Sequence, residues 1–306
     1  METLWLGNAN AWECDELGHL NVRAYMAKAM AAAGGLADRL GMPYAFTSRA
    51  TATLLMRQAH LRYHAEVLPG APLKIEGGVE AACDATLDAV FVMTNAASGA
   101  LAATIRVRFD HVDPATARRF PFATRTREAL EQWRVETPEA ARPRGVGEAD
   151  GAAFSLAEAR TIGLERSGLG RIGPEDCDLF GRMRPEMAIG KVSDSVVHFS
   201  SGLPEQWRDH AGHGRPKRAS AVLEMRVIMR RYPRAGAGFE LRSGLTAADA
   251  KVRNLVHWAC DARTGEALWS MEGVACMLDL QTRRLVRAEG ETLEALKAAV
   301  IEGLEP

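Results

Sequence analysis

The chain has 306 residues, of which 47% are hydrophobic and 25% are charged, and its formal net charge is −1. This composition is typical of a soluble globular protein, and the length allows two domains of ordinary size. A net charge so close to zero gives no general attraction to nucleic acid or to an anionic membrane, so we expect neither as a partner.

Targeting signals and metal-binding patterns are not evident in the sequence. No run of 18 uninterrupted apolar residues occurs, and the N-terminus lacks the basic and apolar regions of a signal peptide. The five cysteines are scattered and never form a C-x-x-C pair, which argues against a disulfide framework or a zinc site. We therefore expect a cytoplasmic protein with neither a metal nor a cofactor.

The first predicted element is an acidic loop that leads through a glycine turn into a helix, within residues 12–26. Asp15 precedes Gly18, which allows a sharp bend of the backbone, and Asn21 is a suitable N-cap for the helix. The free N–H groups and the dipole at the start of a helix favour negative charge. This pattern predicts a site for a polarised carbonyl oxygen, with Asp15 directed at the carbonyl carbon or at a water.

The loop resembles the Asp-x-x-Gly-His-x-Asn pattern of the hotdog-fold acyl-CoA thioesterases, in which a tyrosine follows in the helix. The matching residues are Asp15, Gly18, His19, Asn21 and Tyr25. The family includes proteins similar to 4-hydroxybenzoyl-CoA thioesterase and to acyl-ACP thioesterases. The resemblance implies an α+β fold in which an antiparallel sheet wraps a long helix, and an enzyme that hydrolyses an acyl thioester.

The elements after this loop follow the order of a hotdog domain. Strong helix formers predict a helix over residues 22–40, with Gly34-Gly35 as its weak point. Alternating hydrophobic segments then predict strands over residues 50–67, 73–82, 87–95 and 101–112. Residues 125–135 are predicted to form a short helix, and residues 136–151 have the composition of a linker.

The second half of the chain repeats the first. Asp178 and Gly181 align with Asp15 and Gly18 at one common offset, and a helix is predicted after Pro185. Three turns of the predicted sheet also recur, and these share a single, slightly longer offset. The turn pairs are Pro69-Gly70 with Ala235-Gly236, Ser98-Gly99 with Thr264-Gly265, and Asp113 with Asp279. A constant offset over separate turns indicates a tandem duplication of one α+β unit.

The duplication predicts two tandem hotdog domains on one chain. We assign the N-terminal hotdog domain to residues 1–124, the linker with its short helix to residues 125–160, and the C-terminal hotdog domain to residues 161–306. Hotdog units normally pair edge to edge, so we expect the two sheets to form one continuous sheet. The monomer would then be a pseudo-dimer, with a homodimer as the alternative.

The two halves differ in their motif residues. Asp178 and Gly181 are kept in the second half, but arginines replace the histidine and the asparagine, and Glu186 is added in the first helical turn. We therefore predict that the first half is catalytic and that Asp178, Gly181, Arg182 and Glu186 form a degenerate second site. The alternative is that Asp178 or Glu186 acts at a working second site, because some hotdog thioesterases place their carboxylate on the helix.

The predicted first site contains the groups that thioester hydrolysis needs. Asp15 is a candidate general base, or a nucleophile that forms a mixed anhydride, and the sequence allows both routes. Backbone N–H groups near Gly18 and His19 are candidates for holding the carbonyl oxygen. His19 either transfers a proton or orients the loop, Asn21 is a cap or loop brace, and Tyr25 is a substrate-binding residue that packs near the acyl pocket.

Basic residues in the second half offer a further contact with the substrate, an acyl-CoA or acyl-ACP thioester. Arg215, Lys217 and Arg218 are candidates for binding the phosphates of coenzyme A, although such clusters are also common on solvated surfaces.

Two other functions are compatible with the same fold. The first is a hotdog enoyl-CoA hydratase, a class whose motif resembles Asp-x-Asn-Pro-x-His, with the histidine five positions after the aspartate. Here Asp15 and His19 are four positions apart and Asn-Pro is absent. A non-catalytic acyl-thioester-binding protein would keep the fold without turnover. Release of free thiol from a panel of acyl-CoA substrates separates the three functions.

Overall fold

The structure is a computed structural model that describes residues 1–147, 151, 153–212 and 217–305. The chain divides into two compact units. One consists of Met1–Arg142 together with Asp178–Glu186, and the other of Pro143–Cys177 together with Met187–Pro306. The second motif loop, Asp178–Glu186, therefore groups with the N-terminal residues and not with the sheet that follows it in sequence.

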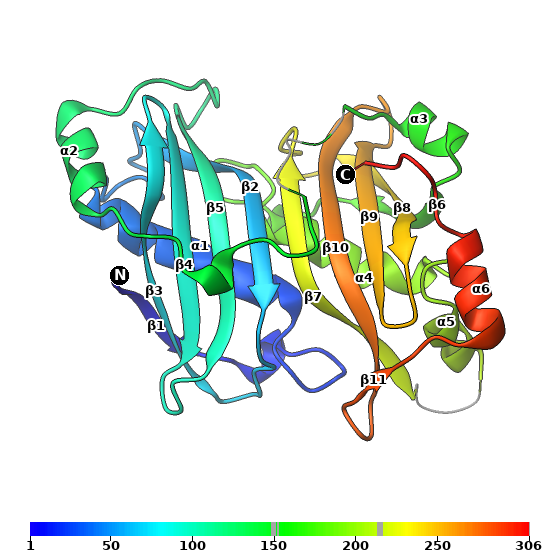
Figure 1. The fold of residues 1–306 in the computed structure, drawn as a ribbon. Coiled ribbons are helices and arrows are strands. Elements are labelled where there is room, and N and C mark those ends of the chain that lie inside the picture. The colour runs from blue at the N-terminus through cyan, green and yellow to red at the C-terminus, as the bar shows by residue number, and fades with distance from the viewer. Residues whose placement is uncertain (148–150, 152, 213–216, 306) are drawn as a thin grey trace. The chain divides into compact units, whose positions relative to one another are not determined.

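The first unit is an antiparallel sheet with one long helix against its face. The strand order is β1-β3-β4-β5-β2, and helix α1 contacts β1, β3 and β5, behind which it runs in Figure 1. The strands are β1 (Glu2–Asn8), β2 (Thr53–Tyr63), β3 (Pro72–Cys83), β4 (Thr86–Asn95) and β5 (Leu101–Val112). The helical elements are η1 (Ala11–Glu13), α1 (Val22–Arg39), α2 (Thr124–Gln132) and η2 (Glu139–Ala141), of which η1 and η2 are 3-10 turns.

The second unit has a sheet of the same design, in the order β7-β10-β9-β8-β6, with the short strand β11 beside β10. The strands are β6 (Glu165–Arg171), β7 (Arg218–Met229), β8 (Gly238–Ala248), β9 (Val252–Asp261), β10 (Ala267–Asp279) and β11 (Leu285–Val286). The helical elements are α3 (Leu156–Thr161), η3 (Pro174–Asp176), α4 (Glu186–Ser195), η4 (Val196–His198), α5 (Pro204–Ala211) and α6 (Gly290–Ala298). Glu186, the first residue of α4, belongs to the first unit.

These elements confirm the predicted α+β class and the tandem repetition of a helix and an antiparallel meander. The predicted helices after Asn21 and Pro185 begin at Val22 and Glu186. The four predicted strands of the first half correspond to β2 to β5. Strands β1 and β6, which form one end of each sheet, were not predicted.

The backbone itself shows the duplication. The first residues of β1 and β6 are separated by the same number of positions as Asp15 and Asp178. The first residues of β4 and β9 are separated by the same number of positions as the aligned turns, for example Gly70 and Gly236. Gly18 and Gly181 both have positive φ, +79° and +73°. Among the described residues the two non-glycine positions with positive φ, Ala117 and Arg283, are also separated by the offset of the aligned turns.

Helix α1 continues through Gly34 and Gly35, where a weak point was predicted. A Cβ atom at residue 35 would lie 2.6 Å from the carbonyl oxygen of Leu4. Glycine at this position therefore allows β1 to pack directly against the helix, and this close approach offsets the low helix propensity of the residue.

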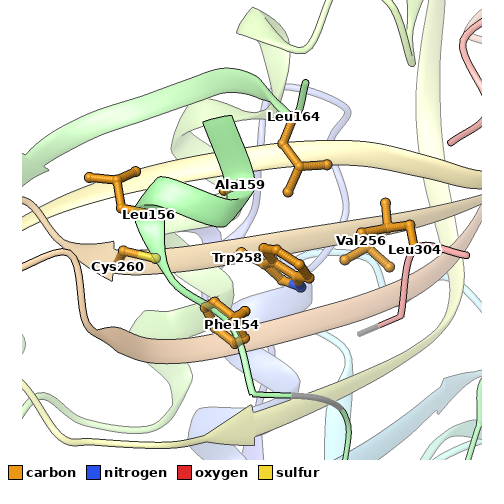
Figure 2. Close-up of a cluster of buried hydrophobic side chains, with 8 residues drawn as sticks. All are labelled: Phe154, Leu156, Ala159, Leu164, Val256, Trp258, Cys260 and Leu304. Atoms are coloured by element: carbon orange, nitrogen blue, oxygen red, sulfur yellow. The ribbon is translucent and has the colours of Figure 1, made fainter. Parts of the chain in front are cut away.

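A hydrophobic cluster ties both ends of the second unit's chain to its sheet (Figure 2). Phe154 stacks on Trp258 of β9, with ring centroids 4.7 Å apart, and Leu304 lies in the same cluster. Leu156 and Ala159 of α3 are also buried there.

Within the described ranges, no helix is long and apolar enough to cross a membrane.

Candidate active site

The first motif loop is a tight turn closed by its own backbone. The Asp15 N–H donates to the His19 carbonyl at 3.0 Å, and the Gly18 N–H donates to the Asp15 carbonyl at 3.0 Å. The positive φ of Gly18 makes this closure possible without strain. Asn21 then caps α1 as predicted, because its side chain accepts from the Arg23 N–H at 2.9 Å.

The two carboxylate oxygens of Asp15 have different surroundings. Oδ1 accepts from the Leu17 N–H at 3.0 Å, whereas Oδ2 lies 3.6 Å from Nδ1 of His19. The Asp15 side chain is 15% exposed. Burial raises its pKa, while His19 and the Leu17 N–H act in the opposite direction. One oxygen is thus anchored, and the other faces an imidazole.

His19 lies between two carboxylates. Its Nε2 is 3.8 Å from Oε1 of Glu66, on the side opposite the 3.6 Å contact with Asp15. Glu66 was not identified from the sequence, since it follows β2 and is distant from the motif along the chain. The imidazole thus has a carboxylate near each ring nitrogen, and its Nδ1 is also 3.5 Å from the Leu20 carbonyl oxygen.

Tyr25 packs beside this group. Its ring meets that of Tyr63 edge-on, with centroids 5.1 Å apart, and a backbone hydrogen bond with Val67 lowers the pKa of its hydroxyl. Burial raises the pKa of Tyr25, and Glu66 and Asp15 are near enough to raise it further. The tyrosine is therefore neutral and connects the motif loop to the end of β2.

A buried ion pair under the loop was also missed from the sequence. Lys28 of α1 is 5% exposed, and its Nζ donates to both carboxylate oxygens of Glu13 at 2.8 and 2.7 Å. Glu13 in turn accepts from the backbone and the side chain of Asn10. This pair fastens the 3-10 turn η1, and with it the residues just before Asp15, to the helix.

The second motif loop has the same backbone and the same ion pair. The Asp178 N–H donates to the Arg182 carbonyl at 2.7 Å, and the Gly181 N–H to the Asp178 carbonyl at 3.0 Å. Nζ of Lys191 is 2.7 Å from Oδ2 of Asp176. This pair corresponds to Lys28–Glu13, because both of its residues lie at the same sequence offset that separates the two loops. The recurrence of a lysine and a carboxylate at this offset is the signal by which the sequence could have revealed the pair.

The side chains of the second loop differ from those of the first. Oδ1 of Asp178 accepts from the N–H groups of Phe180 and Arg182, both at 2.9 Å. Oδ2 lies 3.7 Å from Nε of Arg182. No imidazole is present in this loop, so Asp178 faces a guanidinium where Asp15 faces the ring of His19.

Glu186 is engaged by arginines. Its Oε1 is 3.1 Å from Nη1 of Arg184, and Arg23 of the first half also acts on its charge. The pKa of Glu186 is raised by burial, and both arginines oppose that increase. The structure therefore places Glu186 within reach of the first half of the chain, in the unit that contains the first motif loop.

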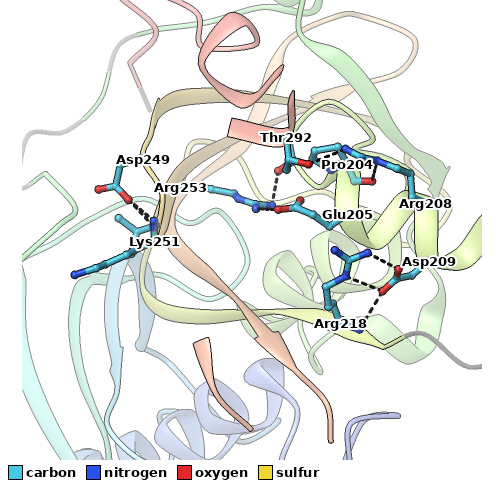
Figure 3. A network of polar contacts seen from close by, with 11 residues as sticks. Pro204, Glu205, Arg208, Asp209, Arg218, Asp249, Lys251, Arg253 and Thr292 are labelled. Atoms are coloured by element: carbon cyan, nitrogen blue, oxygen red, sulfur yellow. Dashed lines mark hydrogen bonds and ion pairs between the residues drawn. The ribbon is translucent and has the colours of Figure 1, made fainter. Parts of the chain in front are cut away.

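The predicted phosphate-binding residues lie elsewhere, around α5 and the start of β7. Arg215 falls outside the described residues. Arg218 is clamped by Asp209, with Nε to Oδ2 at 3.1 Å, and Figure 3 shows the two side chains facing each other. The Lys217 side chain is exposed, and its backbone N–H donates to Asp209. Arg218 therefore already has a carboxylate partner where a phosphate contact was predicted.

In the part of the chain that the structure describes, no group of three or more histidine, cysteine, aspartate or glutamate side chains is arranged to hold a metal ion.

Comparison with family models decides the family. The model of the thioesterase-like superfamily matches residues 9–130 and 172–296, that is, one segment in each repeat. The chain belongs to the thioesterase-like superfamily. Membership identifies it as an enzyme that hydrolyses thioesters. A comparison with curated proteins gives no significant match.

Solved structures agree with this superfamily in fold. An acyl-ACP thioesterase from Bacteroides thetaiotaomicron is 11% identical, with a TM-score of 0.65 over 89% of this chain and 96% of that one. A putative oleoyl thioesterase from Lactobacillus plantarum is 12% identical, with a TM-score of 0.64 over 89% and 94%. A 12:0-ACP thioesterase from Umbellularia californica is 10% identical, with a TM-score of 0.64 over 89% and 92%. At these identities the likeness shows a shared hotdog fold.

Proposed function

We propose that the first motif loop hydrolyses an acyl-CoA or acyl-ACP thioester, with Asp15 as the general base. The observation that carries this proposal is the position of Asp15, which has one oxygen fixed by the Leu17 N–H and the other next to His19. A carboxylate whose pKa is raised by burial takes a proton more readily than an ordinary aspartate.

In the proposed reaction, Asp15 removes a proton from a water, and the water oxygen attacks the thioester carbonyl carbon. The C–S bond then breaks, and the thiolate takes a proton from His19, which recovers it from Asp15. The ring nitrogens of His19 lie 3.6 Å from Asp15 and 3.8 Å from Glu66, beyond hydrogen-bonding distance in the free protein, so the transfer requires the Asp15 contact to tighten when the substrate binds. The products are a free acid and a free thiol.

One of the two backbone donors expected near the oxyanion is used within the turn, because the Gly18 N–H is bonded to the Asp15 carbonyl. In the proposal the oxyanion is stabilised by the other expected donor, the His19 backbone N–H, and by the N-terminal end of α1, where the helix dipole favours negative charge. Asn21 caps that helix, and Tyr25 is buried beside Tyr63, near the proposed acyl site.

The nucleophilic route is the competing mechanism at the same residue. If Asp15 formed a mixed anhydride that water opened at the Asp15 carboxyl carbon, a single turnover in ¹⁸O-labelled water would place the label in the Asp15 carboxylate. The general-base route, and opening of the anhydride at the acyl carbon, place the label in the released acid instead. Mass spectrometry of the peptide that contains Asp15 after one turnover, together with trapping of an acylated Asp15 by hydroxylamine, therefore separates the two routes.

The function itself is tested by the release of free thiol from matched acyl-CoA and acyl-ACP substrates of several chain lengths. We expect turnover with at least one of them, and a loss of about 10²–10⁴-fold in Asp15→Asn. Binding without turnover across the panel would identify a non-catalytic acyl-thioester-binding protein. We place the reaction in the cytoplasm, which the five free cysteines support.

A further inference from the structure

Arg182, the residue of the second loop at the position of His19, has a buried guanidinium that makes no hydrogen bond to the described residues. It is 4% exposed. Within the described part of the chain, none of its three guanidinium nitrogens, Nε, Nη1 and Nη2, has a hydrogen-bond partner. A guanidinium carries five N–H donors, so a buried one without acceptors is costly.

The neighbouring carboxylates balance the charge of Arg182 without satisfying its donors. Asp178 Oδ2 is 3.7 Å from Nε, which is too long for a hydrogen bond. Asp178 is held at that distance because its Oδ1 accepts from the Phe180 and Arg182 N–H groups. Asp113 is also within electrostatic reach of Arg182, but its Oδ1 accepts from Thr116 and Ala115.

The guanidinium lies just beneath the surface. It sits over the ring of Phe180 at 5.0 Å, and both Phe180 and Asp178 are only partly buried. Arg184, the other arginine of the loop, already has a carboxylate partner, since its Nη1 is 3.1 Å from Oε1 of Glu186. An incoming group that displaces the Phe180 ring would reach Arg182.

We infer that Arg182 binds an oxyanion, a phosphate or a carboxylate, in the second motif loop. The planar guanidinium matches such groups with two parallel hydrogen bonds. The duplicated turn explains the location, since the first copy of the same turn presents His19 beside the proposed catalytic carboxylate. The degenerate loop would thus have exchanged a proton-transfer residue for an anion-binding residue.

The inference deepens the proposed function but does not require it. If the proposed function holds, the anion is a phosphate of the thiol carrier or a carboxylate on the acyl group. Binding of the anion can be measured without hydrolysis, so the two claims can fail separately.

The test compares the full-length protein with Arg182→Met by isothermal titration calorimetry and thermal melting. The probes are coenzyme A, pantetheine, inorganic phosphate and succinate. We expect Arg182→Met to weaken binding of the recognised anion by about 10–100-fold, as the loss of charge-assisted hydrogen bonds implies. Without ligand, its melting temperature should be unchanged or higher, because an unsatisfied buried charge has been removed.

The probes distinguish the sources of the anion. Binding of coenzyme A and of inorganic phosphate, with no binding of pantetheine, would indicate a phosphate site. Binding of succinate would indicate a carboxylate site. The matched control is Arg242→Met, since Arg242 is satisfied by Glu240 and by the Leu164 carbonyl. It should lower the melting temperature and leave binding intact.

Two results would overturn the inference. One is that no probe binds the wild-type protein. The other is that Arg182→Met melts at a lower temperature with unchanged affinity, which would make Arg182 a structural residue. Thiol release by the wild-type protein is measured on the same samples, so a failure of catalysis with intact anion binding counts against the proposed function alone.

Discussion

The loops at Asp15 and Asp178 are closed by the same hydrogen bonds and are fastened by equivalent ion pairs, Lys28–Glu13 and Lys191–Asp176. Their side chains differ, because Arg182 and Arg184 stand in the second loop where the first has His19 and Asn21. In the first loop the aspartate faces an imidazole at 3.6 Å, and in the second a guanidinium at 3.7 Å. The same turn backbone therefore carries two different sets of side chains, and the side chain that faces the aspartate differs in chemistry between them.

Replacing that side chain should have a large effect in the first loop. His19→Asn keeps a polar group of similar reach but cannot pass a proton between Asp15 and Glu66, so we expect a loss of about 10²-fold in kcat. Steady-state thiol release measures this loss, and Glu66→Gln should show a smaller one. Full activity in His19→Asn would assign the histidine to orientation of the loop.

The duplicated ion pairs separate stability from catalysis. Lys28→Met leaves Glu13, 23% exposed, without its cation, and we expect a loss of about 2–3 kcal/mol in the free energy of unfolding. Lys191→Met should cost a similar amount, because Asp176 is left in the same situation. Urea denaturation measures both.

Catalysis should respond to only one of these variants. Lys28→Met loosens the turn that leads to Asp15, so kcat should fall while KM changes little. Lys191→Met is the matched control and should keep kcat. Equal losses of kcat in the two variants would show that the pairs act through global stability and not by positioning Asp15.

Position 35 tests how β1 packs on α1. Gly35→Ala places a Cβ atom 2.6 Å from the Leu4 carbonyl oxygen and should destabilise the first unit by about 1–3 kcal/mol. Gly34→Ala is the control, since its Cβ would be 4.0 Å from Phe46. The control should be neutral or more stable by up to about 1 kcal/mol. Similar melting temperatures for the two variants would contradict the close approach of the strand.

The smallest expected effect concerns pH. Burial raises the pKa of Asp15 above its ordinary value of 3.8, so the acid limb of the pH profile of kcat/KM should lie above that value. The folded state holds this proton more tightly than the unfolded state, so stability is lost as pH rises through the raised pKa. Asp15→Asn should therefore melt slightly higher than wild type at neutral pH. An acid limb at or below 3.8 would contradict the role of burial.

Local sequence signals predicted a large part of the fold. The helix after Asn21 and the strands β2 to β5 follow from capping, composition and alternation, all of which act over a few residues. The two edge strands β1 and β6 were missed because they are short and contain glycine, and each pairs with a strand distant in sequence. The constant offsets in the sequence were the more reliable guide, because they do not depend on local propensity.

The candidate site was predictable only where its residues are neighbours in sequence. The turn from Asp15 to Asn21 has the expected form, but Glu66 reaches His19 only through the path of β2. Arg218 illustrates the same point. Its charge predicts a phosphate contact, and the fold also brings Asp209 to it at hydrogen-bonding distance, which the sequence did not show. Which charges are satisfied depends on tertiary contacts that composition does not show.

The most direct test of the catalytic asymmetry is the turnover of Asp15→Asn and Asp178→Asn on the same acyl thioester, with melting temperatures as the check on folding. We expect Asp15→Asn to lose about 10²–10⁴-fold in kcat while it stays folded. Asp178→Asn should keep most of its turnover and lose stability, because Asp178 organises its loop through Phe180 and Arg182. An inactive Asp178→Asn beside a nearly normal Asp15→Asn would contradict the account and assign catalysis to the second loop.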